Sequence, residues 1–211
     1  MRRTLGKPHP RVVGVDDGAF ARGDRHAPIA AVVVSSPERV EAIRLSRVRV
    51  DGRDGTARVV RLLGTLGAGD GVRAVLVDGA VVGGFNVLDL DAIRRATGVP
   101  VVAVTRRRPD FQRIRAALDR WFPRTAKARF SLLRQHRLFR VATAGAPIWA
   151  AASGCSAADA ARLVRRTTVR GFWPEPLRLA HLVASASRPP RRRSDRTVKG
   201  RHRRPARGPV A

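Results

Sequence analysis

Two aspartates, Asp16 and Asp78, stand where apolar runs end in a chain whose formal net charge is +27. The runs before them, RVVGV and VRAVLV, are short and rich in β-branched residues, which predicts buried strands. Acids at strand ends in so basic a protein could hold divalent metal ions beside a phosphodiester. If the strands are adjacent and parallel, both carboxylates lie at the sheet edge where open α/β folds bind ligands, and can share one or two Mg²⁺ ions. The Asp-Asp-Gly and Asp-Gly sequences are equally typical of solvated turns.

Asp54 and His181 are the next candidates. Asp54 precedes a helical pattern, so it could be a third metal ligand or simply the residue that caps the helix. His181 follows PEPLRLA on an expected helix, where a lone histidine is usually a partly buried structural residue. Beside a metal site, His181 could instead bind a second ion or relay a proton.

Three arginines, Arg106 to Arg108, follow the apolar run VPVVAVT. They leave their strand at the same edge as Asp78, so Arg106 could bind a phosphate group. A solvated basic loop would look the same in the sequence. Cys155 has no evident base near it in the sequence and is expected to be structural.

The composition of the 211 residues favours a polyanionic partner, because 43 Lys and Arg stand against 16 Asp and Glu. We therefore expect nucleic acid as the partner, and DNA in particular. A single cysteine excludes an intrachain disulfide, which fits a reducing compartment. No apolar stretch approaches the roughly 20 residues of a membrane span, and the first residues lack the apolar core of a signal peptide. We expect a cytoplasmic protein that does not interact with membranes.

The apolar patterns predict an α/β fold with a single domain, in which a mixed sheet is flanked by helices. Expected strands are 11–16, 28–35, 40–50, 72–78, 99–105, 138–144 and 147–153. Expected helices are 55–66, 88–97, 111–122, 127–136, 156–168 and 174–187. The first three strands should form a meander, and the alternation of strands and helices after them favours parallel pairing. Residues 1–10 form a basic lead, 11–187 the domain, and 188–211 a basic tail expected to be disordered.

Five segments together resemble the archaeal endonuclease dU family, a relative of endonuclease V: RVVGVDDGAF, VRVDGRDGT, VLVDGAVVGGFNV, VVAVTRRRPDF and TTVRGFWPEPLRLAH. The resemblance covers about residues 10–187. It implies an RNase H-like fold and metal-dependent cleavage of DNA that contains deaminated bases, notably deoxyuridine. Asp16 and Asp78 match the carboxylates of the first and fourth strands, and Asp54 falls where endonuclease V has a glutamate. The resemblance also implies that His181 is the last of the residues that line the metal site. It places Arg106 near the position where the family has a basic residue after the fifth strand.

The leading hypothesis is thus an endonuclease that depends on Mg²⁺ or Mn²⁺, with Asp16, Asp54 and Asp78 as metal ligands and His181 completing the site. Two alternatives stay open: a basic nucleic-acid-binding protein without catalysis, and a ribosome-associated factor. The aromatic wedge with which endonuclease V opens a duplex is not recognisable, and the chain has no tyrosine.

Overall fold

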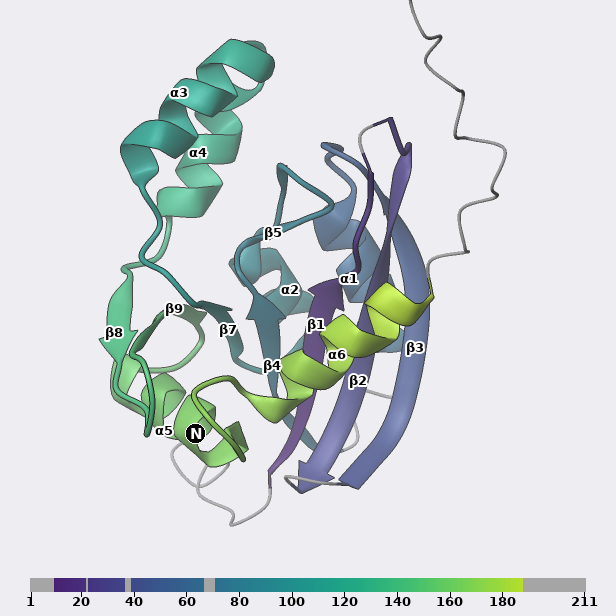
Figure 1. Ribbon diagram of the computed structural model, residues 1–211, viewed down its shortest axis with the longest axis vertical. Coiled ribbons are helices and arrows are strands. Elements are labelled where there is room, and N and C mark those ends of the chain that lie inside the picture. Colours follow the sequence, from purple (N-terminus) through teal and green to yellow (C-terminus); the bar gives the residue numbers. More distant parts are fainter. Residues whose placement is uncertain (1–9, 22, 37–38, 67–70, 188–211) are drawn as a thin grey trace, which may run out of the picture.

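Seven strands form one mixed sheet in the computed structural model, which describes residues 10–21, 23–36, 39–66 and 71–187 (Figure 1). The order across the sheet is β3-β2-β1-β4-β7-β9-β8. The bounds are β1 Arg11–Asp17, β2 His26–Ser36, β3 Arg39–Arg49, β4 Val72–Asp78, β7 Val101–Thr105, β8 Phe139–Val141 and β9 Ile148–Ser153. The basic lead, except for residue 10, and the basic tail lie outside the described residues.

The pairing of the strands follows the prediction up to β7. β1, β2 and β3 form the expected antiparallel meander, and β4 pairs in parallel with both β1 and β7. Beyond β7 the expected parallel pairing is wrong, because β9 runs antiparallel to β7. The reason is that β8 runs in the same direction as β7, and the chain then turns back through a short connection and inserts β9 between them, antiparallel to both.

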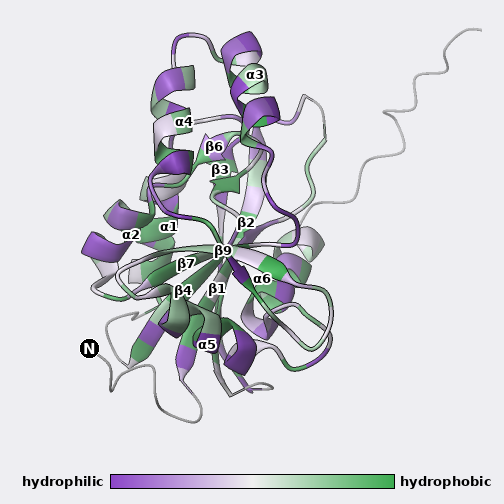
Figure 2. Ribbon diagram, turned by 90° about the vertical axis from the view of Figure 1, so that its left-hand side faces the viewer, coloured by the Kyte–Doolittle hydropathy of each residue, from purple (hydrophilic) through white to green (hydrophobic). Residues whose placement is uncertain are grey.

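Helices cover both faces of the sheet, because the strands alternate apolar side chains between the two faces. On one face Val13, Val15, Val75 and Val77 pack against α1 (Gly55–Gly64) and α2 (Leu90–Thr97). On the other face Val12, Ala74 and Leu76 pack against α5 (Ala157–Thr167) and α6 (Glu175–Ala186). Figure 2 shows the resulting pattern, with hydrophobic colour concentrated in the sheet and polar colour on the outer surfaces of the helices.

Two features lie outside these layers. A hairpin of two short strands, β5 (Val81–Val82) and β6 (Asn86–Val87), interrupts the connection from β4 to α2, where only a loop was predicted. The helices α3 (Phe111–Trp121) and α4 (Ala126–Arg134) follow β7 and lie side by side beyond the ends of the strands (Figure 1). No helix in the described part of the chain is long and apolar enough to cross a membrane.

Close packing of α6 on β1 depends on two glycines of the β1 region. A Cβ at Gly14 would lie 2.1 Å from the carbonyl oxygen of Pro176, and one at Gly18 would lie 2.4 Å from the backbone of Ala184. Real Cβ atoms do not approach backbone so closely, so only glycine lets the helix axis come this near to the strand. The segment of α6 between these two contacts therefore lies directly over Asp16.

Candidate active site

The carboxyl ends of β1 and β4 bring Asp16 and Asp78 together, as the sequence predicted. Val15 pairs with Val77 in the parallel register, so the residues that follow each of them lie side by side at one edge of the sheet. Asp16 is only 3% exposed. Burial first, and then the charges of Asp78 and Asp17, raise the pKa of Asp16 to about 9. Burial also raises the pKa of Asp78 to about 6, with Arg106 opposing the shift and Asp17 adding to it. Burial and the neighbouring carboxylates thus disfavour ionisation of both acids, and more strongly at Asp16 than at Asp78.

His181 joins this pair from α6. Its Nδ1 lies 2.9 Å from Oδ2 of Asp16, although 165 residues separate the two in sequence. The imidazole side chain is 51% exposed, so one ring nitrogen contacts the buried acid while much of the ring faces solvent. A group placed in this way can pass a proton between the acid and solvent. The helix packing described above is what sets this contact.

Asp17 is part of the same cluster, a role that sequence reasoning missed. Its backbone N–H donates to Asp16 Oδ1 at 2.7 Å, and its own carboxylate accepts from the backbone N–H of Gly83 at 2.7 Å. Burial is the main cause that raises the pKa of Asp17. Asp17 thus positions Asp16 and ties β1 to the loop of the β5–β6 hairpin. The doubled aspartate in RVVGVDDGAF was the available signal, but nothing in the sequence indicated its partner.

Arg106 leaves β7 beside Asp78 and lowers the pKa of that carboxyl against the effect of burial. Its guanidinium lies over the ring of Trp173, 4.5 Å from the centroid, just before α6 begins. Arg108 stacks in the same way on Trp149, at 5.3 Å. Such stacking covers the face of a guanidinium and leaves its N–H edge available for an anion. Arg106 is therefore positioned where it could bind a phosphate group next to the acids.

Asp54 lies apart from the carboxylate pair. It precedes α1 at the cap position but makes no side-chain capping bond. Its Oδ1 accepts from the backbone N–H of Arg49 at 3.2 Å and from Nδ2 of Asn86 at 2.8 Å, and Arg58 pairs with Oδ2 at 3.4 Å. Burial opposes ionisation of Asp54, but these hydrogen bonds outweigh it and leave the pKa lowered. The structure brings Asp16, Asp78, His181 and Arg106 together and keeps Asp54 in a separate hydrogen-bond network.

The donor atoms at the sheet edge match the chemistry of Mg²⁺ and Mn²⁺, which prefer carboxylate oxygens. Burial raises the pKa of both carboxyls, and the charge of Asp78 adds to the shift at Asp16, so a cation between them would stabilise the ionised form of each. Among the residues that the structure describes, no group of three or more His, Cys, Asp or Glu side chains could hold a metal ion. The two aspartates fit a divalent cation as partial ligands, and a third protein ligand would require a side chain to move.

Cys155 carries no sign of reactivity. Burial, and then the charge of Asp159, raise the pKa of its thiol to about 11. A thiol that stays protonated is a poor nucleophile, in agreement with the structural role expected from the sequence.

Comparison with known proteins identifies the family. The model of the endonuclease dU family matches residues 8–188. A UPF0215 protein of Thermococcus gammatolerans is 37% identical over 185 residues, which cover 85% of this chain and 93% of that protein. The crystal structure of a protein of unknown function from Archaeoglobus fulgidus superposes with a TM-score of 0.75 and 28% identity, over 84% of this chain and 97% of that one.

Endonuclease V shares the fold. The Ciona intestinalis enzyme, solved with DNA containing an inosine followed by a ribo-adenosine, superposes with a TM-score of 0.54 and 17% identity, over 82% of this chain and 83% of that one. The mixed sheet, with helices on both faces and acids at the ends of β1 and β4, is thus an RNase H-like fold. With the family match over residues 8–188, the conclusion is that this chain belongs to the endonuclease dU family.

Proposed function

We propose that the protein is a Mg²⁺- or Mn²⁺-dependent endonuclease that cleaves DNA containing deaminated bases, with deoxyuridine as the expected target, in DNA repair. The observation that carries this proposal is the buried carboxyl of Asp16 beside the half-buried carboxyl of Asp78, at the carboxyl ends of two adjacent parallel strands in a protein of charge +27. The net positive charge attracts nucleic acid by itself, in a salt-dependent way, and that attraction gains nothing from a buried acid placed beside a second acid. Membership of the endonuclease dU family supports the same reaction and the same substrate.

Asp16 and Asp78 are the proposed metal ligands. A divalent cation held by them would supply positive charge where charge develops on the scissile phosphate. Asp54 is the proposed third ligand, and it would have to give up the hydrogen bond from Asn86 to serve. Asp17 does not need to bind the cation, because its bonds to Asp16 and Gly83 already give it the role of holding the first ligand in place.

His181 and Arg106 are proposed to complete the reaction. One proton can be shared between His181 Nδ1 and Asp16 Oδ2, and the exposed part of the imidazole can exchange it with water. Arg106 contributes a fixed positive charge beside Asp78, where a phosphate oxygen of the strand would lie. These roles need no movement of either side chain toward the acids.

The test is nicking of labelled oligonucleotides that carry deoxyuridine, hypoxanthine or no lesion, with Mg²⁺, with Mn²⁺ and with EDTA. We expect metal-dependent nicking of the deoxyuridine strand, and a loss of at least about 100-fold in Asp16→Asn and in Asp78→Asn. Asp159→Asn on α5 removes the same charge far from the sheet edge and should keep full activity. Activity of the Asp16 and Asp78 variants within about tenfold of the parent would refute the assignment.

The alternative of a nucleic-acid-binding protein without catalysis predicts salt-sensitive binding and no nicking with any metal. A ribosome-associated factor would prefer RNA and be indifferent to EDTA. The pairing of buried Asp16 with Asp78 favours the enzyme over both alternatives, because neither gives a reason to place a second carboxylate where its charge disfavours ionisation of Asp16.

A further inference from the structure

The helices α3 and α4 have a composition that differs from the rest of the described domain. Residues 111–134 contain seven Lys and Arg and one acid, Asp119. Only Leu118 and Ala126 are buried apolar residues within the two helices. Around this small apolar core, Trp121 and six of the seven Lys and Arg side chains are exposed.

One face of α3 gathers exposed cations and an exposed aromatic ring. Arg113 and Arg120 are seven residues apart and so lie on the same side of the helix, with Trp121 beside them. Trp121 is 65% exposed, and the guanidinium of Arg120 lies 5.0 Å from the centroid of its ring. Arg124 follows in the exposed turn before α4. These four residues are called the α3 face below.

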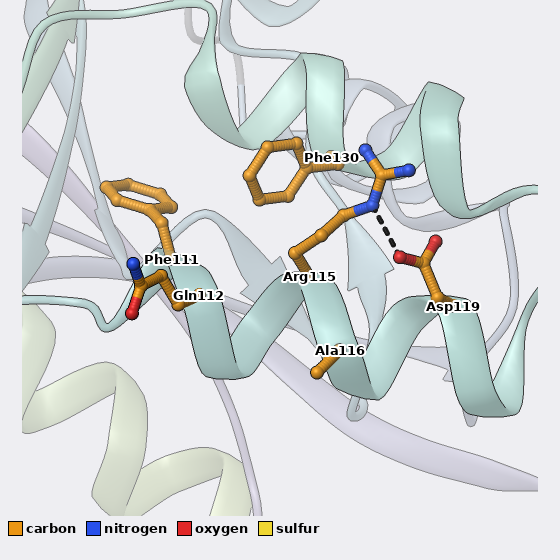
Figure 3. A pocket seen from close by; sticks show the side chains of 6 residues that line it. All are labelled: Phe111, Gln112, Arg115, Ala116, Asp119 and Phe130. Carbon is orange, nitrogen blue, oxygen red and sulfur yellow. Dashed lines mark hydrogen bonds and ion pairs between the residues drawn. The ribbon is translucent and has the colours of Figure 1, made fainter.

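The opposite side of the hairpin is different. There a groove of about 460 Å³ is lined by Phe111, Gln112, Arg115, Ala116, Asp119 and Phe130 (Figure 3). Arg115 points along this groove, donates to Asp119 at 2.7 Å and lies 5.3 Å from the centroid of the Phe130 ring. Its charge is therefore already neutralised by a carboxylate. Arg113 of the α3 face also pairs with an acid, Asp110, but at the longer distance of 3.3 Å, and its side chain is 90% exposed against 46% for Arg115.

The hairpin has a fixed position relative to the candidate active site. Arg129, buried in α4, donates to the carbonyl oxygens of Phe85 and of Asp51, the latter at 2.9 Å. The rings of Phe122 and Phe85 pack at 5.6 Å between centroids. Gly83, two residues before Phe85, binds the carboxylate of Asp17. The same short loop thus contacts both the helical hairpin and the acidic cluster.

From this arrangement we propose that the α3 face binds single-stranded DNA, with Arg113, Arg120 and Arg124 contacting phosphates and the indole of Trp121 stacking on an unpaired base. Exposed aromatic rings interleaved with cations are how proteins hold single strands without reading a specific base. A base in a duplex has no free face for such stacking, which is why the ligand is a single strand. The inference rests on the proposed function in one respect: the strand held here is the strand presented to Asp16 and Asp78.

The test measures binding separately from cleavage. The full chain is titrated in EDTA against a short fluorescein-labelled single-stranded DNA containing one deoxyuridine, at several salt concentrations. Trp121→Ala should weaken binding by about 5- to 150-fold without changing the salt dependence, and Trp121→Phe should restore most of the affinity. Arg120→Ala with Arg124→Ala should reduce the slope of log K against log salt by about 1.4, at about 0.7 per phosphate contact on single strands.

The matched control removes two exposed charges elsewhere, by Arg61→Ala on α1 and Arg165→Ala on α5, and should leave the slope unchanged. The proposal is overturned if Trp121→Ala binds as tightly as the parent, if the control lowers the slope as much as the α3 variants, or if the parent does not bind. Circular dichroism spectra of the variants establish that each is folded. A parent whose binding depends on the α3 face but which never nicks DNA would overturn the proposed function alone.

Discussion

Replacing Asp78 by asparagine should make the metal-free protein more stable at neutral pH. Burial, against the opposing charge of Arg106, raises the pKa of Asp78 from 3.8 to about 6 in the folded protein. The folded state therefore binds a proton more tightly than the unfolded chain does, so the stability of the parent falls as the pH rises from about 4 to about 6. A difference of about two units corresponds to about 3 kcal/mol of unfolding free energy above this window. Asparagine keeps the shape and cannot ionise.

Urea titrations in EDTA at about pH 4 and about pH 7 measure this effect. The Asp78→Asn variant should match the parent at the lower pH and exceed it at the higher pH by up to about 3 kcal/mol, or up to about 10 °C in Tm. Asp159→Asn, which removes a partly exposed charge on α5 that pairs with Arg162, should show no such gain. Adding Mg²⁺ should narrow the gap, because the cation stabilises only the folded parent. A variant less stable than the parent at neutral pH, or a gain equal at both pH values, would refute the reasoning.

Four further changes test other parts of the structure. His181→Ala should slow nicking less than Asp16→Asn does, because water can partly replace the imidazole. If time courses of nicking show equal losses of rate in the two variants, His181 is an obligatory ligand instead. Gly14→Ala should lower the unfolding free energy by about 1–3 kcal/mol, since the new Cβ would meet the α6 backbone at 2.1 Å, and an unchanged urea midpoint would contradict that packing. Arg129→Met leaves two backbone carbonyls without their donor and should lower the unfolding free energy, measured by thermal unfolding, by about 3 kcal/mol. A loss of less than about 1 kcal/mol would contradict this role of Arg129. Deleting residues 188–211, which carry ten Lys and Arg and one Asp, should keep the nicking rate at saturating DNA and flatten the salt dependence of binding, whereas an unchanged slope would assign all phosphate contacts to the domain.

The central part of the site could be predicted from the sequence because it depends on strong local signals. Two β-branched runs predicted the strands β1 and β4, and the lengths of these runs placed Asp16 and Asp78 at the strand ends. Parallel pairing of neighbouring strands then brought Asp16 next to Asp78. The start of the expected helix 156–168 depends on an equally local contact, because the Ser156 hydroxyl accepts from the backbone N–H of Asp159 at 3.1 Å.

The rest depends on contacts that no local pattern encodes. The strands β5 and β6 have two residues each, too few to show any periodicity, so the hairpin that anchors Asp17 was predicted only as a loop. Asp54 was correctly expected at the start of a helix, but the partners of its carboxylate, Asn86 and Arg49, come from other elements. The buried position of Arg129 runs against its residue type, and only the tertiary structure shows the carbonyls that it binds.

The contact between Asp16 and His181 also bears on how the protein is made. At about 5 to 20 residues per second, a ribosome needs about 8 to 33 s to synthesise the chain between these two residues. Until α6 has been synthesised, the residues that pack on Gly14 and Gly18 and the imidazole partner of Asp16 do not yet exist. The proposed nuclease centre therefore forms among the last events of folding, and a nascent or truncated chain that lacks α6 can bind nucleic acid through its charge before it can cut.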